Sequence, residues 1–259
     1  TILNTLGLET TALGFVAGFT GKAIEDGLAA QGIHTDFIHL PEGNSRINVK
    51  VKHGDETEIN GQGPVITEEA INELFAKLAT LTKEDILVLA GSIPNTLPED
   101  IYEKILARLE SKGIRVVVDA TKDLLLNVLK YHPFLIKPNN HELGEMFGIV
   151  CKTDEDIVHY AKKLQEKGAV NVLISMAGDG AILITEDGQN IKMGTPKGKV
   201  VNSVGAGDSM VAGFITGYIR GGNYEEALKS GTAAGSATAF SEGLASLEMY
   251  EKMLKQITE

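Results

Sequence analysis

Cysteine is almost absent from this sequence, and so are long apolar runs. Cys151 is the only cysteine in 259 residues, so no internal disulfide and no thiolate metal cluster can form. The six histidines lack zinc-ligand spacing with it. No apolar stretch approaches the roughly 20 residues of a membrane-spanning helix. These absences predict a reducing, cytoplasmic setting without membrane association, and Cys151 as a buried or half-buried apolar side chain.

Positive charge is also scarce. The chain carries 24 Lys and Arg against 35 Asp and Glu, a net charge of -11. So acidic a surface disfavours binding to nucleic acids or to anionic membranes. A phosphate ligand would depend on local features, namely helix N-termini, clustered backbone N–H groups and a few placed cations.

Buried apolar runs alternate with helical patterns from residue 67 onward. The expected strands lie at 86–90, 116–118, 134–136 and 171–175. The expected helices lie at 67–80, 98–112, 123–130, 154–167, 207–221, 224–240 and 247–257. This alternation is typical of a mostly parallel central sheet covered by helices on both faces.

The residues before this alternation follow a different pattern. Residues 33–40 and 47–53 alternate polar and apolar side chains between turns, which predicts a small antiparallel sheet. We therefore expect one α/β domain over residues 1–259, with a β appendage contributed by about 33–60. Residues 1–7 resemble the last turns of a helix stopped by Gly7, and we expect further chain upstream of Thr1.

Polar or glycine-rich turns follow four of the expected strands. They are Gly91-Ser92, Asp119, Lys137-Pro138-Asn139, and Ser175 with Gly178 and Gly180. The carboxyl ends of parallel strands meet at one edge of a sheet, and ligands bind beyond that edge. The sequence therefore predicts that these four turns surround one site.

The segment VNSVGAGDSMVAG at 201–213 is the strongest candidate for chemistry. Gly205 and Gly207 free the backbone at the start of an expected helix, whose N–H groups and dipole can hold an anion. Asp208 lies in the first turn, where it can act as the base for a hydroxyl that receives a phosphoryl group. The alternative is a tight glycine turn followed by an aspartate that only caps the helix.

Two commoner phosphate-binding motifs do not fit. A dinucleotide-binding G-x-G-x-x-G starting at Gly205 would need glycine where Met210 stands. A P-loop ending at Gly21-Lys22 would need glycine in place of Val16 and Ser or Thr in place of Ala23. The sequence thus disfavours a dinucleotide-dependent oxidoreductase and a P-loop site.

Further residues are candidates for ligand contacts. Glu142 could reach, through water, a magnesium ion on the phosphates of ATP, but Asn139 and Glu142 could equally form a helix capping box. Arg46, on the appendage strand with Asn48, could grip a substrate phosphate, and Ser92 could donate to the same phosphate. The alternatives are a solvated arginine and a turn serine.

Together these residues resemble the PfkB carbohydrate kinases of the ribokinase-like superfamily, over essentially the whole chain. VNSVGAGDSMVAGF at 201–214 is similar to the family's C-terminal signature, roughly D-T-x-G-A-G-D-x-F-x-x-G. Asn202 and Ser203 replace Asp-Thr, and Ser209-Met210 follow the aspartate. With SRINVK at 45–50 and AGSIP at 90–94, these departures look like the hexose-phosphate branch of the family.

The resemblance implies a ribokinase-like fold and ATP-dependent phosphoryl transfer to a ketohexose phosphate. The implied reaction converts fructose 1-phosphate to fructose 1,6-bisphosphate, with tagatose 6-phosphate as the alternative acceptor. The implied catalytic groups are Asp208 as base and Gly205, Ala206 and Gly207 as anion hole. The implied contacts to ATP and Mg²⁺ are Ser175, Gly178, Gly180, Ser203, Val204, Asn139 and Glu142, with Glu142 reaching the metal through water. The implied contacts to the sugar phosphate are Arg46, Asn48 and Ser92.

The resemblance also implies a role for the β appendage and a further segment before Thr1. The β appendage would close over the sugar as a lid, which in several relatives is also a homodimer surface. The family's amino-terminal strand, N-P-x-x-D segment and G-G-K-G-x-N turn have no counterpart here, and we expect them to precede Thr1. A catalytically silent sugar- or nucleotide-binding regulator on the same fold is the alternative from another class, which the intact Asp208 disfavours.

Overall fold

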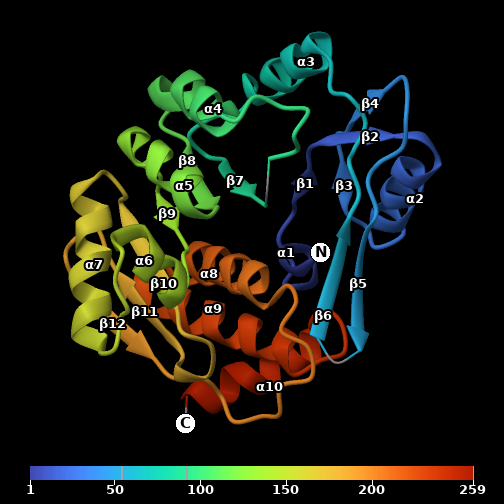
Figure 1. Cartoon of the computed structure of the whole chain (residues 1–259). Helices are drawn as coiled ribbons and strands as arrows, with labels where there is room; N and C mark the ends of the chain where they lie inside the picture. The colour runs from blue at the N-terminus through green and yellow to red at the C-terminus, as the bar shows by residue number, and fades with distance from the viewer. Residues whose placement is uncertain (54, 92, 259) are drawn as a thin grey trace.

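The computed structural model describes residues 1–53, 55–91 and 93–258, with the side chains at 50–53, 55–58 and 258 left aside (Figure 1). Its centre is a six-stranded sheet in the order β12-β11-β10-β9-β8-β7. The parallel strands are β7 (Ile86–Ala90), β8 (Arg115–Asp119), β9 (Leu135–Ile136) and β10 (Asn171–Ser175). The antiparallel strands β11 (Ala181–Ile184) and β12 (Asn190–Met193) extend the sheet beyond β10. All four expected strands are confirmed, with parallel pairing.

The inner strands of this sheet, β8 to β11, are largely apolar on both faces. In β8, Val116 and Val118 pack into one core, and Val117 between them packs into the other. All three side chains are buried, because successive residues of a strand point to opposite faces. A sheet that buries both faces requires continuous apolar runs, which is the pattern of these strands in the sequence.

Helices cover each face of the sheet (Figure 1). The first face packs against α3 (Glu68–Leu78), α4 (Ile101–Leu109), α5 (Lys122–Val128), α6 (Asn140–Phe147) and α7 (Asp154–Glu166). The second face packs against α8 (Ala206–Gly221) and α9 (Tyr224–Ala239), and α1 (Ile2–Thr5) and α10 (Leu247–Thr258) pack against these two helices. Short 3-10 turns stand at η1 (Glu110–Lys112), η2 (Leu129–Tyr131) and η3 (Ala177–Asp179). The expected layers are confirmed, and no helix in the described ranges is long and apolar enough to cross a membrane.

Local capping explains where several helices begin. The Thr67 side chain accepts a hydrogen bond from the Ala70 N–H at 3.3 Å at the start of α3, as its position in the sequence predicts. The proline-led helix starts later than expected, because Pro98 lies in a preceding turn whose carbonyl accepts from the N–H of Ile101. Gly7, with a φ of 78°, ends the short α1 turn, as expected.

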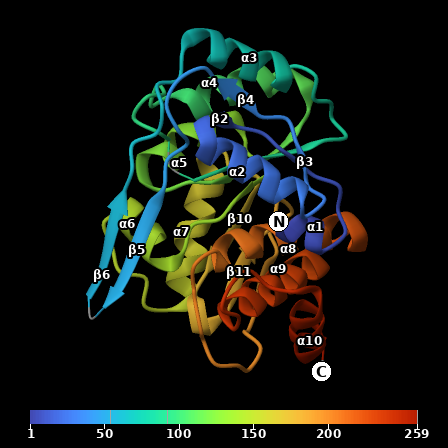
Figure 2. The ribbon, with the colours of Figure 1, turned by 90° about the vertical axis from the view of Figure 1, so that its right-hand side faces the viewer.

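The amino-terminal part differs from the prediction. β1 (Thr11–Ala12) pairs in parallel with β3 (His34–Thr35), and β2 (Phe15–Ala17) pairs in parallel with β4 (Ile38–Leu40), with α2 (Gly18–Ala29) between them in the chain. The antiparallel hairpin is instead β5 (Asn48–His53) with β6 (Asp55–Asn60). The expected pairing of 33–40 with 47–53 is therefore wrong, because 33–40 belongs to a βαβ crossover. Figure 2 shows the hairpin at the margin of the molecule.

Candidate active site

The register of the sheet brings the four strand-end turns to one edge. Ala90 of β7 pairs with Asp119 of β8, whose neighbour Val118 pairs with Ile136 of β9. Val172 pairs with the same Ile136, and an isolated bridge joins Asn139 to Ser175. The expectation that residues 91, 119, 137–139 and 175 gather at one edge of the sheet is confirmed.

The glycine-rich segment forms the N-terminus of α8 at this edge. Gly205 is the N-cap residue with a φ of 79°, a left-handed conformation that favours glycine. The N–H of Ala206 donates to the carbonyl of Ser203, and the N–H of Val204 donates to the side chain of Asn202. Asp208 is exposed in the first turn, where its carboxylate lies beside the positive end of the helix dipole.

Two buried hydroxyl groups fix α8 immediately behind Asp208. The Thr238 hydroxyl donates to Ser209 Oγ at 2.8 Å, and Thr238 Oγ1 accepts from the N–H of Ala245 at 3.2 Å. Ser209 and Thr238 are both almost completely buried. The first turn of α8 is thereby held against α9, so the position of Asp208 is set by packing.

A buried ion pair lies at the centre of the edge. Lys137 Nζ is 3.3 Å from Asp119 Oδ1, and their side chains are 8% and 17% exposed. Burial raises the pKa of the Asp119 carboxyl, Lys137 opposes that rise, and the nearby carboxylates of Asp208 and Glu142 add to it. These interactions place three carboxyl groups and one ammonium in a single electrostatic cluster.

Asn139 and Glu142 form the capping box of α6. Asn139 Oδ1 accepts from the N–H groups of His141 and Glu142, and Glu142 Oε2 accepts from the N–H of Asn139 at 2.8 Å. The structural alternative for this pair is thus confirmed. Because a carboxylate has two oxygens, this cap leaves Oε1 of Glu142 as the oxygen that can meet a ligand.

The turn after β10 closes the same edge. The N–H of Ser175 donates to the carbonyl of Pro138, and the N–H of Met176 donates to the carbonyl of Gly180. The Thr195 hydroxyl donates to the carbonyl of Gly178 at 2.8 Å. A side chain at Gly180 would collide with the backbone of Met193, so glycine is required there.

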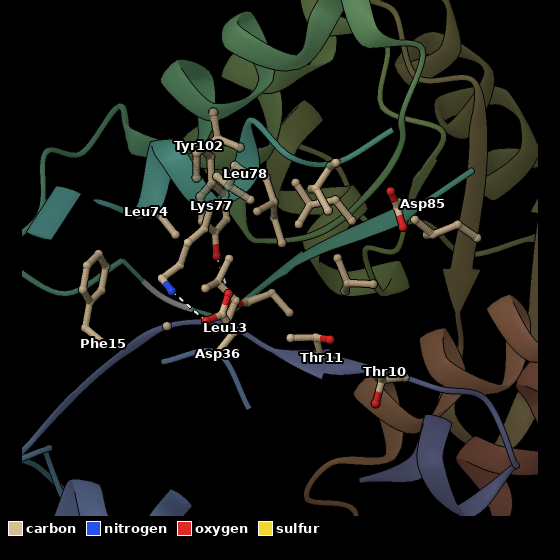
Figure 3. A pocket seen from close by; sticks show the side chains of 18 of the residues that line it. Thr10, Thr11, Leu13, Phe15, Asp36, Leu74, Lys77, Leu78, Asp85 and Tyr102 are labelled. Atoms are coloured by element: carbon tan, nitrogen blue, oxygen red, sulfur yellow. Dashed lines mark hydrogen bonds and ion pairs between the residues drawn. The ribbon is translucent and has the colours of Figure 1, made fainter. Parts of the chain in front are cut away.

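A cavity of about 1330 Å³ lies between β7 and the amino-terminal strands (Figure 3). Lys77 and Asp36 form a 2.6 Å ion pair on its wall, and Figure 3 shows Leu13 and Leu78 close to that pair. None of residues 205–208 is among the lining residues, so the N-terminus of α8 lies outside this cavity. It meets the edge at Tyr102, whose hydroxyl donates to the carbonyl of Ala90. Burial, with the charge of Asp119, raises the pKa of Tyr102 to about 12.

Of the predicted sugar-phosphate contacts, Arg46 lies at the cavity and Asn48 lies outside its lining. Arg46 lines the cavity but stands two residues before β5, so its expected position on a strand is wrong. Asn48 is the first residue of β5 and is exposed. Ser92 lies outside the residues that the structure describes.

Three residues in these contacts were not assigned a role from the sequence. The sequence marks Asp119 and Lys137 only as strand ends, and their pairing depends on strand register, which a single sequence does not give. Thr238 lies in the middle of an expected helix, where nothing marks a buried hydroxyl. The sequence signal that could have found Lys137 is a charged residue joined directly to a buried apolar strand.

The fold and this site define a class of protein. A mostly parallel sheet whose carboxyl edge carries an aspartate at a glycine-rich helix N-terminus is the arrangement of a small-molecule kinase. The sequence matches the pfkB family carbohydrate kinases over residues 1–249. The chain therefore belongs to this family, and its resemblance to it is confirmed.

Similar proteins agree with this assignment. A 1-phosphofructokinase from Bacillus subtilis is 50% identical over 250 residues, which cover 96% of this chain and 82% of that protein. A D-tagatose-1-phosphate kinase from Bacillus licheniformis is 39% identical, over 99% of this chain and 84% of that protein. A Staphylococcus aureus protein of known crystal structure is 45% identical in sequence to this chain. Its structure matches this one with a TM-score of 0.90, over 98% of this chain and 83% of that protein's chain. The expected ribokinase-like fold is thereby confirmed.

Proposed function

We propose that this protein transfers the γ-phosphoryl group of ATP to fructose 1-phosphate and forms fructose 1,6-bisphosphate. The observation that carries the proposal is the position of Asp208 at the N-terminus of α8, on the edge where four strand-end turns meet. The substrate follows from the similarity to 1-phosphofructokinases, which reaches 50% identity.

Asp208 acts as the general base of the reaction. Its carboxylate takes the proton of the acceptor hydroxyl, the hydroxyl oxygen forms a bond to the γ-phosphorus, and the bond from that phosphorus to the β,γ-bridging oxygen breaks. The electron pair of the broken bond leaves with ADP. The N–H groups of Gly205 and Gly207 hold the charge that develops on the phosphoryl oxygens, and the N–H of Ala206 joins them when it leaves the carbonyl of Ser203.

The phosphates of ATP lie along the neighbouring turns. Backbone groups of Ser203 and Val204 precede the anion hole, and the turn from Ser175 through Gly178 to Gly180 provides a glycine-rich backbone for close approach. Asn139, the N-cap residue of α6, lies on the same edge and would contact the phosphates of ATP there.

Magnesium enters with the nucleotide. Among the described residues, no group of three or more His, Cys, Asp or Glu side chains could hold a metal ion by itself. Glu142, through Oε1, would hold a hydrated Mg²⁺ ion that arrives with the nucleotide phosphates, by accepting a hydrogen bond from one of its waters. Bound there, the ion would neutralise phosphate charge.

The sugar phosphate binds between the edge and the lid. Arg46 carries the positive charge that a second phosphate needs, and Asn48 supplies a polar side chain two residues further on. The contact expected of Ser92 falls outside the residues that the structure describes. Three exposed apolar side chains, Ile47 just before the hairpin and Val49 and Ile59 on it, would cover the bound sugar or pack against a second copy of the chain.

A tagatose phosphate is the second candidate acceptor. The similarity to a D-tagatose-1-phosphate kinase at 39% identity favours it, and both sugars are ketohexoses. An ADP-release assay should compare fructose 1-phosphate, fructose 6-phosphate, tagatose 1-phosphate and tagatose 6-phosphate at equal concentrations. The proposal expects the highest kcat/KM with fructose 1-phosphate. A higher value with a tagatose phosphate would contradict the substrate, and no ADP release with any of the four would contradict the activity.

A further inference from the structure

Lys137 is buried where a lysine is costly. Among the buried residues that the structure describes it is the only charged one, with 7% of its surface exposed. Removing an ammonium group from water requires compensation by opposite charge and hydrogen bonds. Its known partner, Asp119 Oδ1 at 3.3 Å, can accept only one of the three N–H bonds of the ammonium.

The other neighbour of this ammonium is the N-terminus of α8. A Cβ atom built on Gly207 would lie 3.1 Å from Lys137 Nζ, so the ammonium rests against the first turn of the helix. The N-terminal end of a helix carries partial positive charge, and a cation there is unfavourable. The Lys137 ammonium and the α8 N-terminus therefore repel each other. An anion bound between them would be attracted by both and would remove this repulsion.

The surrounding carboxylates do not supply that anion. Asp119 pairs with Lys137 from the strand side, Glu142 is engaged in the α6 cap, and Asp208 is the exposed base. The geometry points to Lys137 as a catalytic residue that binds the transferred phosphoryl group opposite the α8 N–H groups, with Asp119 as its positioning residue. This inference rests on the proposed phosphoryl transfer.

The chemistry of the transfer explains why a fixed cation belongs here. In the transition state the charge spreads over three equatorial oxygens of the γ-phosphoryl group. The α8 N–H groups and the Lys137 ammonium, which rests against the same turn of the helix, would both contact these oxygens. Because burial and Asp119 hold the ammonium in place, little reorganisation accompanies the reaction. Lys137 neither takes nor gives a proton, so the bonds formed and broken are unchanged.

The test replaces Lys137 by an uncharged side chain of similar length. Lys137→Met should lower kcat by about 10²–10³-fold while KM for the sugar phosphate changes only a few-fold, since the lost contact acts in the transition state. A double variant, Lys137→Met with Asp119→Asn, removes both charges and so avoids an unpaired buried carboxylate if the single variant folds poorly. Lys130→Met is the matched control, because Lys130 also pairs with a glutamate but lies on η2, before β9 begins.

A binding measurement separates a catalytic role from a structural one. ADP with aluminium fluoride mimics the transferring phosphoryl group, and its affinity by calorimetry is compared with that of ADP alone. We expect the double variant to bind ADP as the unchanged protein does and to lose the added affinity for the mimic. The role of Lys137 would be overturned if the double variant bound the mimic as tightly as the unchanged protein does. It would also be overturned if kcat of Lys137→Met stayed within threefold of that of the unchanged protein. Absence of turnover in the unchanged protein would instead overturn the proposed function.

Discussion

In the proposed reaction two side chains have different roles, Asp208 as the base and Arg46 as the clamp for the substrate phosphate. Asp208 stands at the α8 N-terminus, and Arg46 lines the cavity between β7 and the amino-terminal strands. A base acts mainly in the transition state, whereas a phosphate clamp holds the substrate in the ground state as well. Their substitutions should therefore affect different kinetic constants.

Replacing Arg46 tests the phosphate clamp. Arg46→Ala should raise KM for the sugar phosphate by about tenfold or more and leave KM for ATP almost unchanged, since a charge-assisted contact contributes roughly 1.5–3 kcal/mol. Steady-state kinetics with each substrate varied in turn measure both constants. An equal rise of the two KM values would show that Arg46 does not bind the sugar phosphate.

Single residues differ in how well the sequence predicts them. Asp208 stands out because a glycine-rich turn and a helix start are local patterns. Lys137 and Asp119 meet only through the register of β8 with β9 and the approach of α8, which are long-range features. The sequence could name both as strand ends but could not pair them.

Helices α8 and α9 pack closely because small residues line their contact. A Cβ atom at Gly213 would lie 2.6 Å from the Cβ of Ala234 and would also meet the carbonyl of Ser230. Backbone atoms cannot move aside as flexible side chains do, so the two helices would have to separate. The close contact between α8 and α9 therefore holds the N-terminus of α8, and with it Asp208, in position.

Two glycine substitutions test this packing. Gly213→Ala should lower the free energy of unfolding by about 1–3 kcal/mol through overpacking. Gly27→Ala, inside α2 with open space around its Cβ position, should raise it by about 0.5–1 kcal/mol. Urea unfolding of both variants measures the difference. A stable Gly213→Ala protein would mean that the helices do not meet as described.

The capping box of α7 gives a prediction about pH. Hydrogen bonds from the N–H groups of Lys152 and Thr153 hold the pKa of Asp156 below its ordinary value. A depressed pKa in the folded state means stability that is present above the unfolded pKa and lost as pH falls through the folded pKa. Asp156→Asn should therefore be less stable than the unchanged protein at neutral pH, and the difference should vanish in strong acid. Thermal unfolding across pH measures it, and a difference independent of pH would contradict the account.

Helix starts could be predicted from local sequence, whereas the pairing of strands distant in the chain could not. Thr67, Asn139 and Thr153 mark helix starts because a cap is made within one turn. The pairing of residues 33–40 was predicted wrongly, since β3 and β4 find their partners across α2 and not across the adjacent turn. Alternation predicts a strand but does not choose its partner.

At the scale of the whole molecule, the hairpin β5–β6 is the part with the least support from the core. Val49 and Ile59 are cross-strand partners, and their side chains are 45% and 60% exposed. An exposed apolar pair on a two-stranded ribbon is a typical contact surface. The chain is therefore expected to associate with a second copy through this face.

Charge on that face should prevent association. The double variant Val49→Glu with Ile59→Glu should elute as a monomer where the unchanged protein elutes as a dimer, because like charges would face each other across the contact. Light scattering after size-exclusion chromatography gives the mass of each. An unchanged mass for the variant, or a monomeric unchanged protein, would contradict the lid as a dimer surface.

The central claim is that Asp208 is the base of a phosphoryl transfer to a ketohexose phosphate. The most direct measurement compares turnover of Asp208→Asn with that of the unchanged protein, using fructose 1-phosphate and ATP. Asp154→Asn, an acid in the first turn of α7, is the matched control. We expect kcat to fall about 10²–10⁴-fold for Asp208→Asn with nearly normal ATP affinity, and to change little for the control. An unchanged turnover number for Asp208→Asn would contradict the central claim.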